Sequence, residues 1–155
     1  MRGLPRAVYD GMARTGYWAP LQGDQLPAGL DLACFDFGWN TGIGSAARRL
    51  QWLIGATQDG QIGPKTLARL TACALAPIAR ALAPAEARTL QARLGVTMDG
   101  QVGPETLDAL AAAPDAAIRP VVLLLAWARP RPPITAPSPT SRSTAPARLA
   151  RTGRR

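Results

Sequence analysis

A carboxylate and an amide, Asp36 and Asn40, lie four residues apart in a segment that also contains Trp39. If this segment is helical, the two polar side chains are neighbours on its surface. The aromatic pair Tyr17 and Trp18 lies earlier in the chain. Aromatic faces cover sugar rings, and carboxylates and amides bond to hydroxyl and N-acetyl groups, so this combination suits a carbohydrate groove. Bonding of Asp36 and Asn40 to the adjacent loop ends is an equally good interpretation.

A second source of chemistry is an internal repeat. Residues 50–70, LQWLIGATQDGQIGPKTLARL, align without gaps on residues 90–110, LQARLGVTMDGQVGPETLDAL, and each copy predicts a helix, a turn and a helix. In the turn, Asp59 is expected to accept backbone amides, Gly60 to adopt positive φ and Thr66 to bond back to the turn. Folding alone explains these residues, and direct binding of sugar or peptide by them is the second hypothesis.

The chain offers few residues for catalysis. Histidine is absent, which excludes Ser-His-Asp and Cys-His catalysis and most histidine-based metal sites. Glycoside hydrolysis normally needs a general acid with a raised pKa. Glu86 is predicted in the first turn of a helix, and Glu105 aligns with Lys65, which indicates an exposed position. We therefore expect no catalytic residue, no metal site and no cofactor in this chain.

The two cysteines, Cys34 and Cys73, lie among apolar residues at helical spacing. Such cysteines are usually small buried residues, so neither a disulfide framework nor a zinc site is predicted.

The periodicity and the turn dipeptides predict an all-α fold with duplicated helix–turn–helix units. Ser45 is expected to be an N-cap, Pro77 to kink or end a helix, and Pro120 to interrupt one. Outside the second copy, helices are expected over these segments: 5–15, 28–39, 45–55, 64–76 and 114–128.

Charge is unevenly distributed along the chain. The 155 residues carry a formal charge of +8, but seven arginines and no acid follow Ala128. The nearly neutral body disfavours a nucleic-acid-binding domain. Residues 129–155 are rich in Pro, Ser, Thr and Arg and are expected to be disordered. A solvated tail is the favoured interpretation, and contact with anionic polymers such as teichoic acids is the alternative.

Two further patterns concern localisation. The longest apolar run, residues 121–127, is far too short to span a bilayer, and the N-terminus has no secretory signal. We expect synthesis in the cytoplasm and action at the cell wall or in the periplasm only after release by a holin or another partner.

The order of these motifs resembles glycoside hydrolase family 108, the lysozyme-like N-acetylmuramidases of phages and bacteria, some of them described as secretion activators. The family pattern is approximately YW, LPAGLD, FDxxxNxG, an LQ-bearing helix and DGxxGPxT, the start of its peptidoglycan-binding region. The resemblance covers about residues 8–72, at Tyr17-Trp18, Leu26–Asp31, Phe35-Asp36, Asn40, Gly42, Leu50-Gln51 and Asp59–Thr66.

The resemblance implies a protein directed at peptidoglycan glycan strands and at their MurNAc–GlcNAc β-1,4 bond. It implies substrate-binding roles for seven residues, namely Tyr17, Trp18, Asp36, Asn40, Asp59, Gly60 and Thr66. In the family the catalytic Glu lies in EGGY, followed by DPGG, before the YW motif. Nothing in this sequence matches that segment. The comparison therefore implies an N-terminally truncated muramidase-like chain without its catalytic Glu.

Three regions follow from these observations. Residues 1–48 are the expected C-terminal part of a muramidase-like domain, 49–128 a peptidoglycan-binding-like region with both DGxxGPxT copies, and 129–155 the tail. In the first hypothesis, the chain is part of a muramidase and is active only when its missing segment is restored. In the second hypothesis, the chain is a non-catalytic peptidoglycan-binding module. In the third, it is a structural or prophage remnant without a ligand.

Overall fold

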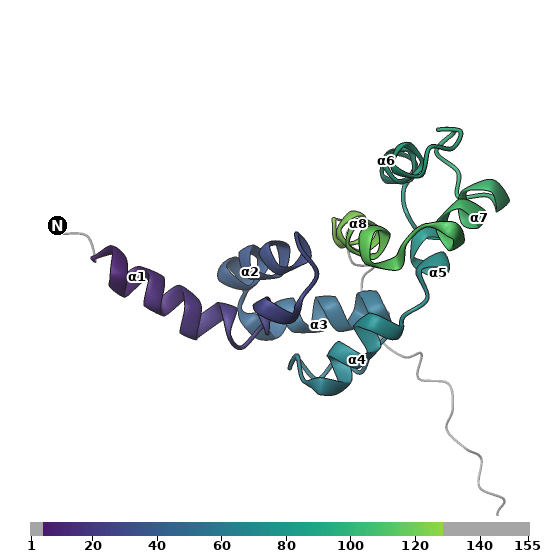
Figure 1. The fold of residues 1–155 in the computed structure, drawn as a ribbon. Helices are drawn as coiled ribbons and strands as arrows, with labels where there is room; N and C mark the ends of the chain where they lie inside the picture. Colours follow the sequence, from purple (N-terminus) through teal and green to yellow (C-terminus); the bar gives the residue numbers. More distant parts are fainter. Residues whose placement is uncertain (1–4, 129–155) are drawn as a thin grey trace, which may run out of the picture.

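The computed structural model describes residues 5–128 (Figure 1). All regular elements in that range are helices, which confirms the predicted all-α fold class. The tail at 129–155 lies outside the described residues. The elements are α1 (Arg6–Ala13), the π-helical turn η1 (Arg14–Trp18), the 3-10 turn η2 (Gly23–Gln25), α2 (Leu30–Thr41), α3 (Ile43–Ile54), α4 (Pro64–Ala72), α5 (Leu75–Arg80), α6 (Pro84–Leu94), α7 (Pro104–Ala112) and α8 (Asp115–Trp127).

The helices from α3 onward fall into two successive groups of three, and each group contains one copy of the duplicated sequence. The first group consists of α3, α4 and α5, and the second of α6, α7 and α8. The middle helices begin at equivalent prolines, Pro64 and Pro104. Proline suits the first position of a helix because its missing N–H would have no intrahelical partner there. The structure thus adds a third helix to the helix–turn–helix unit predicted from the sequence.

The first helices of the two copies end in the same way. Gly55 after α3 and Gly95 after α6 have φ of 66° and 70°, a left-handed conformation that favours glycine. The start of α3 differs from the prediction, because Ser45 is not its N-cap. The helix begins at Ile43, and Gly42, with φ of 91°, joins it directly to α2. Only glycine adopts that conformation readily, so α3 begins earlier than Ser45 suggested.

A buried glutamine ties the two helices of the first copy to the turn between them. The Gln51 side chain, on α3, is fully buried. Its Nε2 donates to Asp59 Oδ1 at 2.6 Å and to the main-chain oxygen of Gln61 at 2.9 Å. The same nitrogen lies 3.2 Å from Thr66 Oγ1, and its Oε1 accepts the N–H of Gly60 at 3.0 Å. This one side chain therefore pairs polar groups of an irregular turn that would otherwise lack partners.

The second copy repeats this network. Nε2 of Gln91 donates to Asp99 at 2.7 Å and to the main-chain oxygen of Gln101 at 3.0 Å, and lies 3.2 Å from Thr106 Oγ1. Its Oε1 accepts the N–H of Gly100 at 2.9 Å. Because two separate segments reproduce the same bonds, the network is a property of the repeated sequence.

Arg48 and Arg88, each three residues before the buried glutamine of its copy, extend the repeat beyond the segment aligned above. A Cβ atom on Gly60 would lie 3.1 Å from the guanidinium carbon of Arg48, and one on Gly100 would lie 3.3 Å from that of Arg88. Both glycines have φ of 81°. The arginines therefore cover the two turns from the same side, and glycine is required there both for its conformation and for the close approach.

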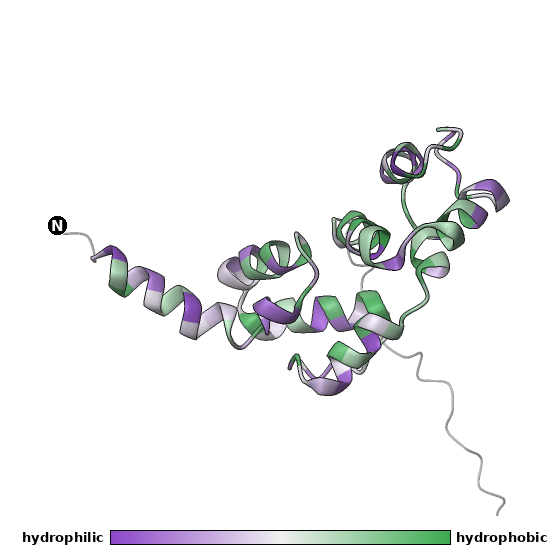
Figure 2. Ribbon diagram, viewed as in Figure 1, coloured by the Kyte–Doolittle hydropathy of each residue, from purple (hydrophilic) through white to green (hydrophobic). Residues whose placement is uncertain are grey.

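Helix α8 lies between two hydrophobic cores. Leu123 and Trp127 pack with residues of α2, α3 and α4. Ile118, Val122 and Ala126 pack with residues of α5, α6 and α7. Figure 2 shows α8 as strongly apolar, whereas apolar and polar residues alternate along α1. A helix with two apolar faces thus joins the two copies into one body.

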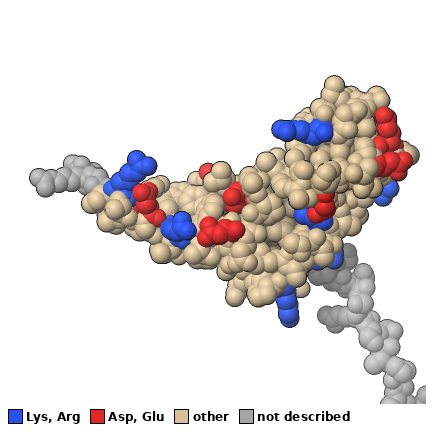
Figure 3. All heavy atoms as spheres, viewed as in Figure 1, with Lys and Arg blue, Asp and Glu red and all other residues tan. Residues whose placement is uncertain are grey.

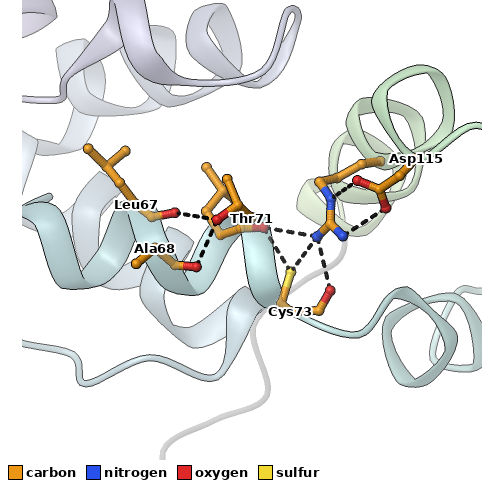
Figure 4. A network of polar contacts seen from close by, with 7 residues as sticks. Leu67, Ala68, Thr71, Cys73 and Asp115 are labelled. Carbon is orange, nitrogen blue, oxygen red and sulfur yellow. Dashed lines mark hydrogen bonds and ion pairs between the residues drawn. The ribbon is translucent and has the colours of Figure 1, made fainter.

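Arg119 fastens α8 to the end of α4, at the network of polar contacts around Cys73 and Asp115 that Figure 4 shows. Its Nη1 donates to the main-chain oxygens of Leu70 at 3.0 Å and Cys73 at 2.9 Å. The last carbonyls of a helix have no intrahelical partner, so these bonds satisfy groups that the end of α4 leaves open. Asp115 holds the guanidinium through bonds of 2.7 and 2.8 Å from Nε and Nη2.

Two prolines have effects different from those expected. Pro77 does not stop a helix over 64–76; α4 ends at Ala72, and Pro77 lies in the first turn of α5. A first-turn N–H has no intrahelical partner, so proline costs little there. Pro120 does not interrupt α8, which continues through it. The buried apolar residues of α8 offset the lost hydrogen bond.

Replacement of the buried glutamine tests its structural role. Gln51→Ala should lower the free energy of unfolding by about 2–4 kcal/mol, because Gly60 and Asp59 lose their shared partner. Urea unfolding followed by circular dichroism measures this change. Gln61→Ala is the matched control, because this exposed residue enters the network through its backbone alone. Equal stability of the two variants would contradict the assignment.

Candidate functional site: an aromatic row and the adjacent turn

Five aromatic rings form a continuous row over α1, η1 and α2. The ring centroids of Tyr17 and Trp39 are 4.6 Å apart, and those of Tyr9 and Trp39 are 5.5 Å apart. Phe35 lies 5.9 Å from both Trp39 and Trp18, and 6.4 Å from Tyr17. These rings are called the aromatic row below. It contains Tyr17, Trp18, Phe35 and Trp39, which the sequence singled out, and adds Tyr9.

The row is open to solvent at one end and packed at the other. Tyr9 is 50% exposed and Trp39 is 36% exposed. Tyr17, Trp18 and Phe35 are half-buried. No residue of α1 is buried, and Figure 1 shows this helix extending away from the rest of the molecule. The row therefore attaches α1 and η1 to α2 and also presents aromatic surface to solvent.

Trp18 couples the row to the turn that follows it. Its indole Nε1 donates to Asp24 Oδ1 at 2.9 Å. A Cβ atom on Gly23 would lie only 2.3 Å from the Trp18 ring, so glycine is the residue that lets the turn approach the ring. Gln22, next to it, has φ of 55°, and is the one residue other than glycine with positive φ in the described part of the chain.

Asp36 and Asn40 lie on the exposed surface of α2 beside the row. Both residues are solvent-exposed. Asn40 Nδ2 donates to the main-chain oxygen of Asp36 at 2.8 Å, which is a bond within the helix. The structure thus brings these two polar residues close to Trp39 and Phe35, and it does not place them in the core.

The turn residues Asp59, Gly60 and Thr66 are bound to their own repeat. Thr66 is only 5% exposed, and its hydroxyl faces Gln51 and Gln61. Hydrogen bonds from the Gln51 side chain, and then from the Gln61 amide, hold the pKa of Asp59 below its ordinary value of 3.8. These bonds give the three residues a role in holding the turn, and direct ligand binding by them stays a prediction.

Two adjoining cavities, about 300 and 290 Å³, lie between η2 and the first turn. Both are lined by Gln22, Ile62 and Gly63. Gln61 lines one and Gln25 the other. They are called the turn groove below. Gln22 and Gln25 carried no sequence signal, since the groove exists only because η2 packs beside a turn far away in the chain.

The acidic residues considered for catalysis lie elsewhere. Glu86 is in the first turn of α6 and Glu105 in that of α7. Figure 1 shows both helices at the opposite end of the molecule from α1. On the face drawn in Figure 3, charged side chains of both signs are scattered among wide uncharged areas. Within residues 5–128 there is no cluster of His, Cys, Asp or Glu that would hold a metal ion.

Both cysteines are free and buried, as predicted. Burial raises the pKa of the Cys34 thiol to about 12 and also raises that of Cys73. Both thiols are therefore protonated at neutral pH and are poor nucleophiles. None of the helices described in residues 5–128 has the length and apolar character needed to cross a membrane.

The two turn aspartates predict a pH dependence. Asp59 and Asp99 have lowered pKa values in the folded state, so their ionised forms stabilise the fold at neutral pH. This contribution should disappear as the pH falls below about 4. The free energy of unfolding in urea, measured at about pH 6 and about pH 3, should change less between the two pH values in the double variant Asp59→Asn, Asp99→Asn than in the unmodified protein. The control is Asp108→Asn, because Asp108 is an exposed residue of α7. The same change with pH in the double variant and in the unmodified protein would contradict the role given to the two turn carboxylates.

One comparison with known proteins, the match to a family model, agrees with the sequence resemblance. The model of the family described as Glycosyl hydrolase 108 matches residues 1–42. A solved structure, "Structure of Brucella abortus SagA", is 29% identical, with an alignment that covers 80% of this chain and 67% of that chain at a TM-score of 0.46. No curated protein matches the sequence. The resemblance to glycoside hydrolase family 108 is therefore confirmed for residues 1–42, which include the YW pair, LPAGLD, Phe35-Asp36 and Asn40.

Proposed function

We propose that this chain binds the glycan strands of peptidoglycan through the aromatic row. The observation that carries the proposal is the row itself, in which Tyr9 and Trp39 leave ring surface exposed beside the polar Asp36 and Asn40. Ring faces cover the apolar faces of sugars, while a carboxylate and an amide bond to hydroxyl and acetamido groups. The family similarity supports peptidoglycan as the source of these sugars.

We propose binding without hydrolysis as the activity of this chain. The general acid of a glycosidase is held in an apolar pocket, whereas Asp36 is exposed. Asp24, near the other end of the row, is also exposed and accepts the Trp18 indole N–H. The two glutamates, in α6 and α7, lie far from the row in the fold. A purified chain should therefore leave the turbidity of a cell-wall suspension unchanged, and clearing would overturn this part of the proposal.

The other candidate is a part of a muramidase of the phage or bacterial type, which becomes active when a segment with the catalytic Glu is present. It is favoured by the match of residues 1–42 to a glycosyl hydrolase family. In either form, the chain would reach the cell wall after release from the cytoplasm by a holin or another partner. Addition of an EGGY…DPGG segment in front of this chain, followed by the turbidity assay, separates the two candidates.

Retention on insoluble peptidoglycan tests the binding proposal. Trp39→Ala should weaken retention by about fivefold, because loss of one aromatic contact surface costs on the order of 1 kcal/mol. Tyr9→Ala should have a similar effect. Leu32→Ala is the matched control, because Leu32 is an exposed apolar residue of the same helix and lies outside the row. Equal retention of the Trp39 and Leu32 variants, with both chains folded, would contradict the proposal.

A further inference from the structure

The turn groove, defined above, is a concave surface near the aromatic row. Ile43, which lines it, follows Trp39 by four residues where α2 passes into α3. On the other side, the Trp18–Asp24 bond fixes the η2 segment that carries Gln25. The junction of α2 and α3 and the segment from η1 to η2 each contribute residues to both the groove and the row. A ligand longer than one sugar could therefore reach both.

The groove contains a strained residue. Gln22 adopts φ of 55° and ψ of 39°, a left-handed conformation that is unfavourable for a residue with a Cβ atom. Gln25 Nε2 donates to Gln22 Oε1 at 2.6 Å, which orients both amides. Glycine would adopt this backbone without strain, but it would lose the side chain that accepts the bond from Gln25. Such strain is often found where a side chain is placed for binding.

The lining of the groove limits the chemistry of its ligand. Among the described residues that line the two cavities, none is ionisable. Two opposite charges lie beside Gly60, which lines the groove: a Cβ atom there would lie 3.1 Å from the guanidinium carbon of Arg48, and the pKa of the neighbouring Asp59 is lowered first by the Gln51 side chain and least by Arg48. A charged ligand would lose water without gaining a counter-charge. The groove therefore favours a neutral ligand.

The groove offers amides and apolar surfaces together. The side chains of Gln22, Gln25 and Gln61 can donate and accept hydrogen bonds, and Ile43 and Ile62 provide apolar walls. A neutral sugar with an acetamido group has matching features, namely an amide, hydroxyl groups, a methyl group and an apolar ring face. Stem peptides of peptidoglycan carry free carboxylates and fit an uncharged groove less well.

We propose that the turn groove is a second binding site, for a neutral N-acetylated sugar, adjoining the aromatic row. It rests on the proposed function only for the source of the sugar, which would be the next residue of the same glycan strand. The repeat itself does not create the site, because the segment that contains Gln22 and Gln25 is not duplicated.

Titration of the full chain with triacetylchitotriose, followed by amide NMR shifts, tests this site directly. The amides of Gly60, Gln61 and Gly63 should shift, and they should still shift in Trp39→Ala, which removes ring surface from the row. Cellotriose, which has the same linkage without acetamido groups, should bind at least about fivefold more weakly. Absence of these shifts, equal binding of cellotriose, or tighter binding of a tetrapeptide with free carboxylates would overturn the proposal.

One pair of variants and one single variant separate binding from folding. Gln61→Ala should weaken chitotriose binding at least about fivefold, whereas Gln101→Ala, at the equivalent position of the second copy, should leave it unchanged. Gln22→Gly should raise the melting temperature, because glycine accepts the left-handed backbone, and should weaken binding. Equal affinities of Gln61→Ala and Gln101→Ala would overturn the proposal. Failure of the Trp39 variant to affect peptidoglycan retention would instead count against the proposed function.

Discussion

The buried side-chain amide of Gln51, with its counterpart Gln91, is the interaction on which each three-helix unit depends. The turn after α3 has polar backbone groups that no helix or strand pairs. A glutamine amide offers a donor group and an acceptor while it stays neutral, so it can be buried at far lower cost than a charged side chain. The amide fixes the turn, and the turn then sets where Pro64 and Pro104 begin the next helices.

The duplicated unit has two different surroundings in one molecule. The first copy packs against α2, and η2 lies beside its turn, so that Gln61 becomes part of a groove. In the second copy, α6 and α7 pack with α5 and α8, and the same network serves the core. Two similar local sequences thus have different exposed surfaces because the segments packed against them differ. A functional role for one copy does not transfer to the other.

The aromatic row combines structural and binding properties. Its half-buried members hold η1 to α2, and Trp18 also fixes the turn through Asp24 and the close approach of Gly23. Its exposed members, Tyr9 and Trp39, contribute ring surface beyond what this packing requires. Neutral sugars are recognised through ring faces and directed hydrogen bonds, and the row with the exposed side chains of Asp36 and Asn40 beside it offers both.

The sequence by itself determined the features that depend on neighbouring residues. Helical periodicity, Gly55 as a helix stop, Pro64 as a helix start and the repeat are local patterns, so the all-α class and the buried cysteines followed from them. Only the tertiary structure decided which surfaces meet. It placed α8 between two cores, buried Thr66 inside its turn, and brought Gln22 beside Gly60, because packing between distant segments leaves no periodic signal in either one.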